Sequence, residues 1–257
     1  MQVIDSLPAK FDFPTAIAVG YFDGVHKAHS EVIKKAVSYK KQGLTPVVFS
    51  FKTINSAPTK KKGSLLLQTF SLKCQRIEAL GGEVFLCPPF SSFMSMTKEE
   101  FALGLLAKEL NAGAVCCGYD YHFGKGAVGN PTDLKSLLSP LGIKVDTVDA
   151  IMCGDTPVSS TLIRELLQKG EIDTANVLLG YEFTIDFPVA HGRSLGKTLG
   201  FPTANQIFPT GFIIPKFGVY KTRVSIDGKS YLGITNVGRK PTVGETDFVG
   251  AETYVYR

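Results

Sequence analysis

Two histidines three positions apart, His26 and His29, stand where an apolar run gives way to an amphipathic segment. Residues 15–20 have the character of a strand, and residues 30–41 place apolar side chains on one helical face. A helix that begins here would present free backbone N–H groups and a partial positive charge, both of which attract phosphate. Imidazole groups at this position can donate hydrogen bonds to the same anion. The segment therefore favours a phosphate site at a strand-to-helix turn.

A second stretch with the same character lies far downstream, at residues 159–164. Ser159 or Ser160 is a good helix N-cap, and apolar residues follow at helical spacing. Arg164 would lie about one turn into that helix, near enough to reach a phosphate held at its start. Two helix N-termini, two imidazoles and one guanidinium would together form a site for a polyphosphate.

These two stretches resemble the FMN adenylyltransferase module of the prokaryotic FAD synthetases, which are usually bifunctional riboflavin kinase/FMN adenylyltransferases. The resemblance covers nearly the whole chain, and its motifs occur in the same order. The further motifs are the glycine-containing loop at residues 118–126, Pro-Thr-Ala-Asn at 202–205, the segment at 233–242 and Glu-Thr at 252–253.

For the first module, the resemblance implies transfer of AMP from ATP to FMN, which gives FAD and pyrophosphate. It implies catalytic roles for His26, His29 and Arg164, which would neutralise the charge that develops on phosphate during transfer. Mg²⁺ would bridge the phosphates, as it usually does. The resemblance also assigns these residues to the ATP and FMN site: Gly20, Phe22, Asp23, Gly24, Gly118, Asp120, Phe123, Gly124, Ser159, Ser160 and Thr161.

For the C-terminal module, the resemblance identifies Thr203 and Asn205 with the kinase's ligands for Mg²⁺ and phosphate. Glu252 resembles the carboxylate that activates the ribityl hydroxyl of riboflavin, which is a general-base role. Without the resemblance, Pro202 and Thr203 could simply form a turn, and Glu252 could be a surface residue of a strand.

Several residues of the first site also have simpler interpretations. The histidine pair alone could equally be structural or bind a metal, Asp23 could be a turn residue, and Phe123 could belong to the core. His122 is expected on a surface loop. The sequence also departs from the family pattern at Ala28, where glycine is common, and at residues 49–55, which lack the family's Pro-His-Pro. The methyl group of Ala28 would lie where a backbone may approach phosphate, so this departure bears on turnover. The missing Pro-His-Pro bears on the flavin end of the site.

Residues 15–180 alternate strand-like and helical segments, which implies an α/β fold with a parallel, Rossmann-like nucleotidyltransferase sheet. After Gly180 the helical pattern stops, and short runs separated by turns indicate a small antiparallel β-barrel. We therefore expect an FMN adenylyltransferase domain at 1–182 and an incomplete riboflavin kinase-like domain at 183–257. The expected strands are 16–20, 46–51, 83–87, 114–117 and 144–148, and the expected helices are 30–41, 72–80, 97–110, 132–138 and 160–169.

The composition is that of an ordinary globular protein with a mild positive charge. The 257 residues carry a formal net charge of +5, and the one dense basic run, 60–62, lacks the interleaved aromatic residues of a nucleic-acid site. The five cysteines are scattered without Cys-x-x-Cys spacing, which argues against zinc and a disulfide framework. Neither a signal-peptide pattern nor an apolar stretch of membrane-spanning length is present. We expect a cytoplasmic protein that acts on ATP and FMN and binds neither nucleic acid nor membranes.

The resemblance implies that a kinase module continues beyond the position of Arg257 with further strands and a helix. We therefore expect FAD synthesis from FMN without appreciable riboflavin kinase activity. One alternative is a bifunctional enzyme that also phosphorylates riboflavin, and another is a non-catalytic binder of flavin or nucleotide. A further alternative is an adenylyltransferase for pantetheine phosphate or a pyridine nucleotide, against which the loop at 118–126 and the kinase-like tail argue.

Overall fold

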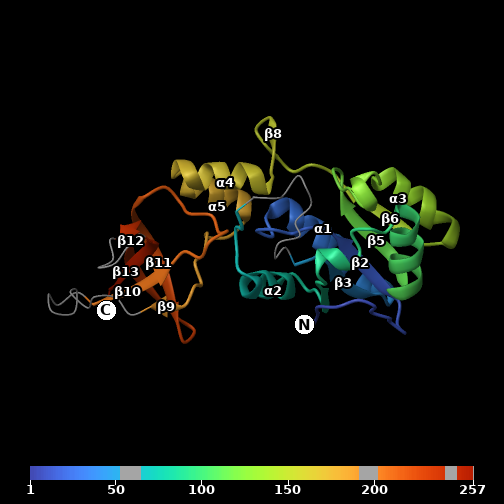
Figure 1. Cartoon of the computed structure of the whole chain (residues 1–257), viewed down its shortest axis with the longest axis horizontal. Coiled ribbons are helices and arrows are strands. Elements are labelled where there is room, and N and C mark those ends of the chain that lie inside the picture. Colours follow the sequence, from blue (N-terminus) through green and yellow to red (C-terminus); the bar gives the residue numbers. More distant parts are fainter. Residues whose placement is uncertain (53–64, 191–201, 241–247, 257) are drawn as a thin grey trace. The chain divides into compact units, whose positions relative to one another are not determined.

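The computed structural model describes residues 1–52, 65–190, 202–240 and 248–256, and the chain forms two compact units (Figure 1). None of the helices in these ranges is both long enough and apolar enough to cross a membrane. Unit 1 comprises Met1–Ser64, Phe70–Ser160 and Leu178–Gly180, and unit 2 comprises Leu65–Thr69, Thr161–Val177 and Tyr181–Arg257.

Unit 1 is built on a parallel six-stranded sheet in the order β1-β4-β3-β2-β5-β6. This confirms the predicted α/β class. The first strand was not predicted, because its three residues are fixed only by pairing with β4 at the edge of the sheet. The strands are β1 (Gln2–Ile4), β2 (Thr15–Val19), β3 (Thr45–Phe49), β4 (Val84–Leu86), β5 (Ala112–Gly118) and β6 (Lys144–Val148).

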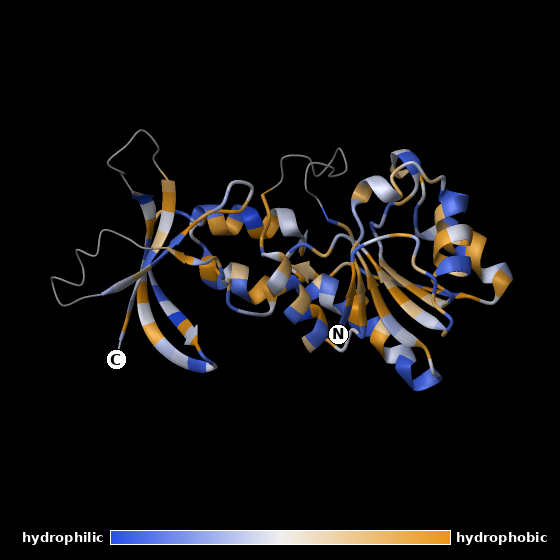
Figure 2. Ribbon diagram, turned by 60° about the horizontal axis from the view of Figure 1, so that its bottom comes forward, coloured by the Kyte–Doolittle hydropathy of each residue, from blue (hydrophilic) through white to orange (hydrophobic). Residues whose placement is uncertain are grey.

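Helices cover both faces of this sheet because alternate residues of each strand face opposite layers. Ala16 and Ala18 pack with α1 and α2, whereas Ile17 and Val19 pack with η3 and α3. Figure 2 shows the hydrophobic colour concentrated in these strands. The bounds are α1 (Lys27–Ser38), α2 (Phe70–Ala79), η3 (Glu100–Glu109) and α3 (Pro131–Leu138), with short elements η1 (Tyr39–Gln42), η2 (Phe90–Ser92), η4 (Lys125–Ala127), η5 (Ser139–Leu141), β7 (Met152–Cys153) and β8 (Thr156–Pro157).

The helix η3 has wide, π-type hydrogen bonding, in which the Leu110 N–H donates to the Leu105 carbonyl. A capping box formed by Thr97 and Glu100 marks its start. The Glu100 N–H donates to Thr97 Oγ1 at 3.1 Å, and the Thr97 N–H donates to Glu100 Oε2 at 2.8 Å.

The order of the strands reverses between β2 and β5, which are neighbours in the sheet but not in the sequence. In open parallel sheets, ligands bind beyond the carboxyl ends of the strands at such a reversal. The histidine turn follows β2, and the loop at 118–126 follows β5. The topology therefore brings two of the predicted motifs to the edge where a ligand is expected.

Unit 2 contains an antiparallel five-stranded sheet in the order β11-β12-β13-β10-β9, which confirms the predicted second β fold. One face packs around Phe187, Phe208, Val237 and Ala251. The strands are β9 (Val189–Ala190), β10 (Thr203–Ile207), β11 (Gly218–Ile226), β12 (Lys229–Lys240) and β13 (Phe248–Val255). The helices α4 (Ser160–Lys169) and α5 (Ile172–Leu179) also belong to unit 2, except for Ser160 and the end of α5 from Leu178 on, which belong to unit 1.

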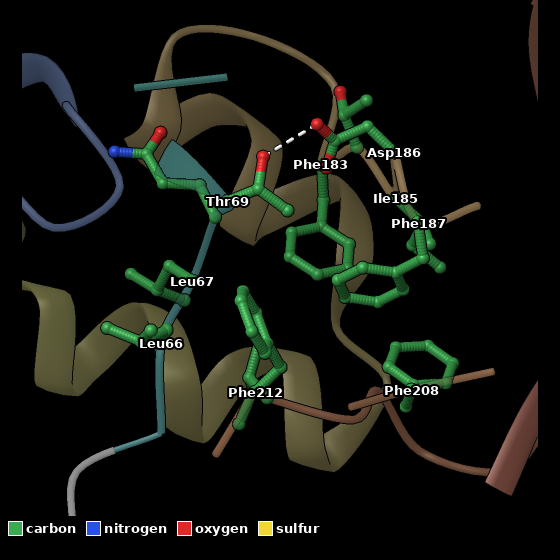
Figure 3. Close-up of a pocket in the computed structure, with 12 residues that line it drawn as sticks. Leu66, Leu67, Thr69, Phe183, Ile185, Asp186, Phe187, Phe208 and Phe212 are labelled. Atoms are coloured by element: carbon green, nitrogen blue, oxygen red, sulfur yellow. Dashed lines mark hydrogen bonds between the residues drawn. The ribbon is translucent and has the colours of Figure 1, made fainter. Parts of the chain in front are cut away.

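A pocket in unit 2 is lined mainly by aromatic and aliphatic side chains (Figure 3). Phe187 meets Phe208 and Phe212 nearly at right angles, with ring centroids 5.5 and 5.1 Å apart. At its polar rim, Thr69 Oγ1 donates to Asp186 Oδ2 at 2.6 Å. The space inside is about 10 Å³, room for a single water molecule. It is a packing gap in the core of unit 2 and too small for a nucleotide.

Candidate active site

The turn between β2 and α1 has a backbone conformation that glycine normally provides. Gly24 has a φ of 82°, and the non-glycine residues Phe22 and Val25 have φ values of 51° and 38°. A non-glycine residue in this region costs about 1–3 kcal/mol and persists only where its surroundings impose it. Both side chains are buried in the core of unit 1, and their packing offsets that cost. Strain of this kind gathers at functional sites, which makes the turn a candidate.

Gly20 lets the ring of Phe22 fold back over the end of β2. A Cβ atom at residue 20 would lie 2.9 Å from Phe22 Cζ, so any larger residue would displace the ring. The Phe22 ring stands almost perpendicular to the ring of His29, with centroids 5.3 Å apart. Gly20 and Phe22 therefore help to set the position of the His29 side chain.

His26 and His29 lie face to face at the start of α1, with ring centroids 3.6 Å apart and planes 19° from parallel. The buried His26 is the N-cap, and its Nδ1 accepts a long hydrogen bond of 3.5 Å from the His29 N–H. In a neutral His26 ring, Nε2 then carries the proton and is a donor. The helix begins at Lys27 rather than at the predicted Ser30, because histidine instead of a common capping residue caps it.

The second motif meets the first at the start of α4. Ser160 Oγ donates a hydrogen bond of 2.9 Å to the carbonyl of Asp23, and both residues are buried. This bond joins positions that are 137 residues apart in the sequence. The structure thus brings the serine cluster, Ser159 and Ser160, next to the histidine turn. The spacing of the sequence alone could not show this.

Arg164 lies one turn after Ser160 in α4, a helix whose bounds match the prediction. Ser159 precedes the helix, and Thr161 is its second residue. Arg164 Nε donates to the carbonyl of Leu65 at 2.5 Å, which orients the guanidinium through one edge. A two-bond grip on phosphate requires such a fixed plane.

The loop after β5 is anchored from the core. Phe123 is buried and packs 5.5 Å from the ring of Phe101, so its ring holds the loop from the side of the core. Gly124 has a φ of 75°, and a Cβ there would lie 3.0 Å from the backbone nitrogen of Lys98. A Cβ on Gly118 would lie 3.2 Å from Asp120 Oδ1, which places that carboxylate against the end of β5. His122 is exposed, as expected.

An open hollow of about 600 Å³ lies beside this loop, at the ends of β5 and β6 and the start of α3. Its size is in the range of small-molecule sites. Sequence reasoning did not identify its residues, although Asn130 and Asp133 form a capping box that marks the start of α3. The lining residues are Tyr119, Asn130, Pro131, Thr132, Lys135 and Thr147.

The kinase-like residues gather on one face of the β10–β13 pair in unit 2. Asn205 stands directly opposite Glu252 in the register, and Thr203 Oγ1 donates to Glu252 Oε1 at 2.7 Å. A hydroxyl, an amide and a carboxylate therefore lie together, and all three offer the oxygen ligands that Mg²⁺ prefers.

A metal ion at this cluster would need further ligands from the substrate. Among the described residues, no group of three or more His, Cys, Asp or Glu side chains could hold a metal. Mg²⁺ commonly takes one or two protein oxygens together with substrate phosphates and water. Thr203 and Asn205 fit that pattern.

Some predicted features lie outside the described residues. These are part of the segment that lacks Pro-His-Pro, at 53–55, the basic run at 60–62, the two residues before the Pro-Thr-Ala-Asn motif, at 200–201, and the end of the 233–242 motif.

Comparison with known families gives a match in each half of the chain. Residues 9–162 match the FAD synthetase family, and residues 179–257 match the riboflavin kinase family. The first match covers the histidine turn, the loop after β5 and the start of α4. The second covers Thr203, Asn205 and Glu252.

Individual relatives agree with the family matches. A bifunctional riboflavin kinase/FMN adenylyltransferase from Bacillus subtilis is 35% identical over 237 residues, which cover 90% of this chain and 74% of that protein. The enzyme of the same description from Listeria monocytogenes is 32% identical over 248 residues, covering 95% and 78%. A crystal structure described as a macrolide-efflux protein from Streptococcus pneumoniae superposes with a TM-score of 0.81 at 27% identity, over 99% of this chain and 90% of that one. The chain therefore belongs to the FAD synthetase family of bifunctional riboflavin kinase/FMN adenylyltransferases.

Proposed function

We propose that this protein catalyses two successive reactions, phosphorylation of riboflavin to FMN and transfer of AMP from ATP to FMN. The observation that carries the proposal is that each half of the chain matches its own family. Two hydrogen bonds support it, from Ser160 Oγ to the Asp23 carbonyl and from Thr203 Oγ1 to Glu252 Oε1. The sequence-based expectation that kinase activity is absent conflicts with the riboflavin kinase match and with the bifunctional relatives. We therefore adopt the bifunctional alternative.

In the adenylyl transfer, a phosphate oxygen of FMN attacks the α-phosphorus of ATP. A new P–O bond forms, the bond from the α-phosphorus to the bridging oxygen breaks, and pyrophosphate leaves. Negative charge builds up on the transferred group and on the leaving phosphates. In our proposal, His26 and His29 donate hydrogen bonds to the transferred phosphate, and Arg164 binds the leaving phosphates.

Holding the reactants in line also lowers the barrier of such a reaction. The strained turn at Phe22, Gly24 and Val25 fixes the donors before substrate arrives. We further propose that the hollow beside Tyr119 holds part of a substrate, since it adjoins the loop that the resemblance assigns to flavin and nucleotide.

In the kinase reaction, the terminal ribityl hydroxyl of riboflavin attacks the γ-phosphorus of ATP, and ADP leaves. Glu252 accepts the proton of that hydroxyl as its oxygen forms the new bond. Thr203 donates to Glu252 Oε1 and so orients the carboxylate. Mg²⁺, when bound, would neutralise the nucleotide phosphates, and Thr203 and Asn205 would hold it.

The test is to incubate the purified chain with ATP, Mg²⁺ and either riboflavin or FMN, and to separate the flavins by chromatography. We expect FMN from riboflavin and FAD from FMN. The negative control is the double variant His29→Ala/Glu252→Gln, which should make neither. If the chain makes FAD from FMN but no FMN from riboflavin, it is an adenylyltransferase only. Binding of FMN without formation of either product would support the non-catalytic alternative.

A further inference from the structure

Lys73 is a lysine of α2 whose side chain is buried within unit 1. Its exposed fraction is 8%, whereas lysine side chains usually keep their ammonium group in water. A buried ammonium is stable only where polar groups replace its hydration shell. Sequence reasoning did not single out this residue, because a lysine in an amphipathic helix usually lies on the solvent side.

The ammonium group of Lys73 closes a triangle of hydrogen bonds. Nζ donates to the carbonyl of Tyr21 at 2.6 Å and to Ser50 Oγ at 2.8 Å. Ser50 Oγ in turn donates to the same carbonyl of Tyr21 at 2.8 Å. Ser50 is fully buried, so the bond between Nζ and Ser50 Oγ forms away from water, where hydrogen bonds to a charge are strong.

Two aromatic rings also lie near the ammonium. Nζ lies 5.2 Å from the ring centroid of Tyr21 and 5.7 Å from that of Phe85, both within the range of a cation–π interaction. The faces of these rings offer negative electrostatic potential to the ammonium. The site thus suits the positive charge of an ammonium group.

The position of the triangle connects it to the histidine turn. Ser50 directly follows β3, and Tyr21 lies two residues past the end of β2, so Lys73 bridges the carboxyl ends of two adjacent strands. The carbonyl that it holds belongs to the peptide that leads into Phe22, the first left-handed residue of the turn. The Phe22 ring is the one that contacts His29.

We propose that Lys73 is a positioning residue for adenylyl transfer. It fixes the Tyr21 carbonyl, and through it the turn that sets the histidine pair. A role in packing alone would be met by methionine, which has similar length and avoids the cost of burying a charge. This inference rests on the proposed adenylyltransferase activity and adds to it a residue that does not touch the substrate.

The experiment compares Lys73→Met with Lys73→Arg, and measures kcat and KM for FAD formation from FMN and ATP. Loss of geometry at a reacting centre can cost on the order of 10²-fold, so we expect Lys73→Met to lower kcat by about 10- to 100-fold. KM for ATP should change little, because the ammonium is proposed to act on the turn and not on the nucleotide. Lys73→Arg should recover most of kcat, since it restores a cation that donates hydrogen bonds.

Two controls separate positioning from general damage. Riboflavin kinase activity of the same samples should remain, because its residues lie in unit 2. Lys34→Met, at an exposed lysine of α1 that pairs with Glu31, should leave both activities unchanged. If Lys73→Met loses kinase activity as well, the substitution disturbs the fold, and Ser50→Ala becomes the test of positioning. Ser50→Ala removes one partner of the ammonium and should lower kcat for FAD formation several-fold.

Each other result overturns the inference. Unchanged kcat in Lys73→Met, or in Ser50→Ala where that variant decides, would show that the triangle only packs the core. An effect on KM alone would place Lys73 in substrate binding, and equal losses in the arginine and methionine variants would show that the cation is irrelevant. A wild-type chain that makes no FAD overturns the proposed function and the inference together, whereas wild-type FAD synthesis with unaffected variants overturns the inference alone.

Discussion

Replacing His29 with alanine is expected to lower kcat for FAD formation by on the order of 10²–10³-fold. The ring of His29 is stacked on His26 and held on another side by Phe22, so it is placed before the substrate binds. A donor fixed in this way stabilises charge as it develops on phosphate, and it loses no free energy in reorganising. Binding of FMN, measured by fluorescence titration, should weaken far less than kcat falls.

His122→Ala is the matched control for this variant. It removes an imidazole from an exposed position of the loop after β5 and should leave kcat close to that of the wild type. Riboflavin kinase activity should also persist in His29→Ala, which would show that the chain is folded. Wild-type kcat in His29→Ala would remove this histidine from the mechanism.

Replacing Glu252 with glutamine should reduce kcat for FMN formation from riboflavin by about 10²–10⁴-fold. Glutamine has nearly the same shape, and its carbonyl oxygen can still accept the hydrogen bond from Thr203 Oγ1. It cannot take a proton from the ribityl hydroxyl. The variant therefore separates proton transfer from local structure, and FAD formation from supplied FMN should continue at the wild-type rate.

The control for this second variant is Glu182→Gln, which alters an exposed carboxylate of unit 2 that pairs with Arg223. It should not affect either reaction. If Glu252→Gln kept its kinase activity, Glu252 would not be the general base. Parallel loss of FAD formation would show instead that the substitution disturbs the whole chain.

The sequence predicted the regular elements best where an apolar period and its boundary signals agree. The helix at 160–169 and the strand at 144–148 have the predicted bounds. The prediction missed α5, a helix of eight residues, and placed the start of α1 three residues late. In the latter case the capping group is an imidazole, which ordinary capping preferences do not include.

The candidate site was only partly accessible from sequence. Motifs identified the histidine turn and the serine cluster, but only the fold shows that Ser160 bonds to the carbonyl of Asp23. The sequence did not identify Lys73 as a candidate for a related reason. Its burial depends on the ends of two strands that come together only in the sheet, and no local pattern encodes that contact.

The buried thiols of unit 1 can report, through their chemical labelling, when its parallel sheet opens. Burial raises the pKa of Cys116 to about 12 and the pKa values of Cys87 and Cys117 to about 11. Because the thiolate is the reactive form, these three side chains should react with an alkylating dye only when the sheet opens. All five cysteines precede residue 154 and belong to unit 1, so no labelled cysteine of unit 2 adds to the signal. The slow phase of labelling would therefore follow the local stability of the nucleotidyltransferase sheet, and its retardation by ATP would measure binding without any turnover.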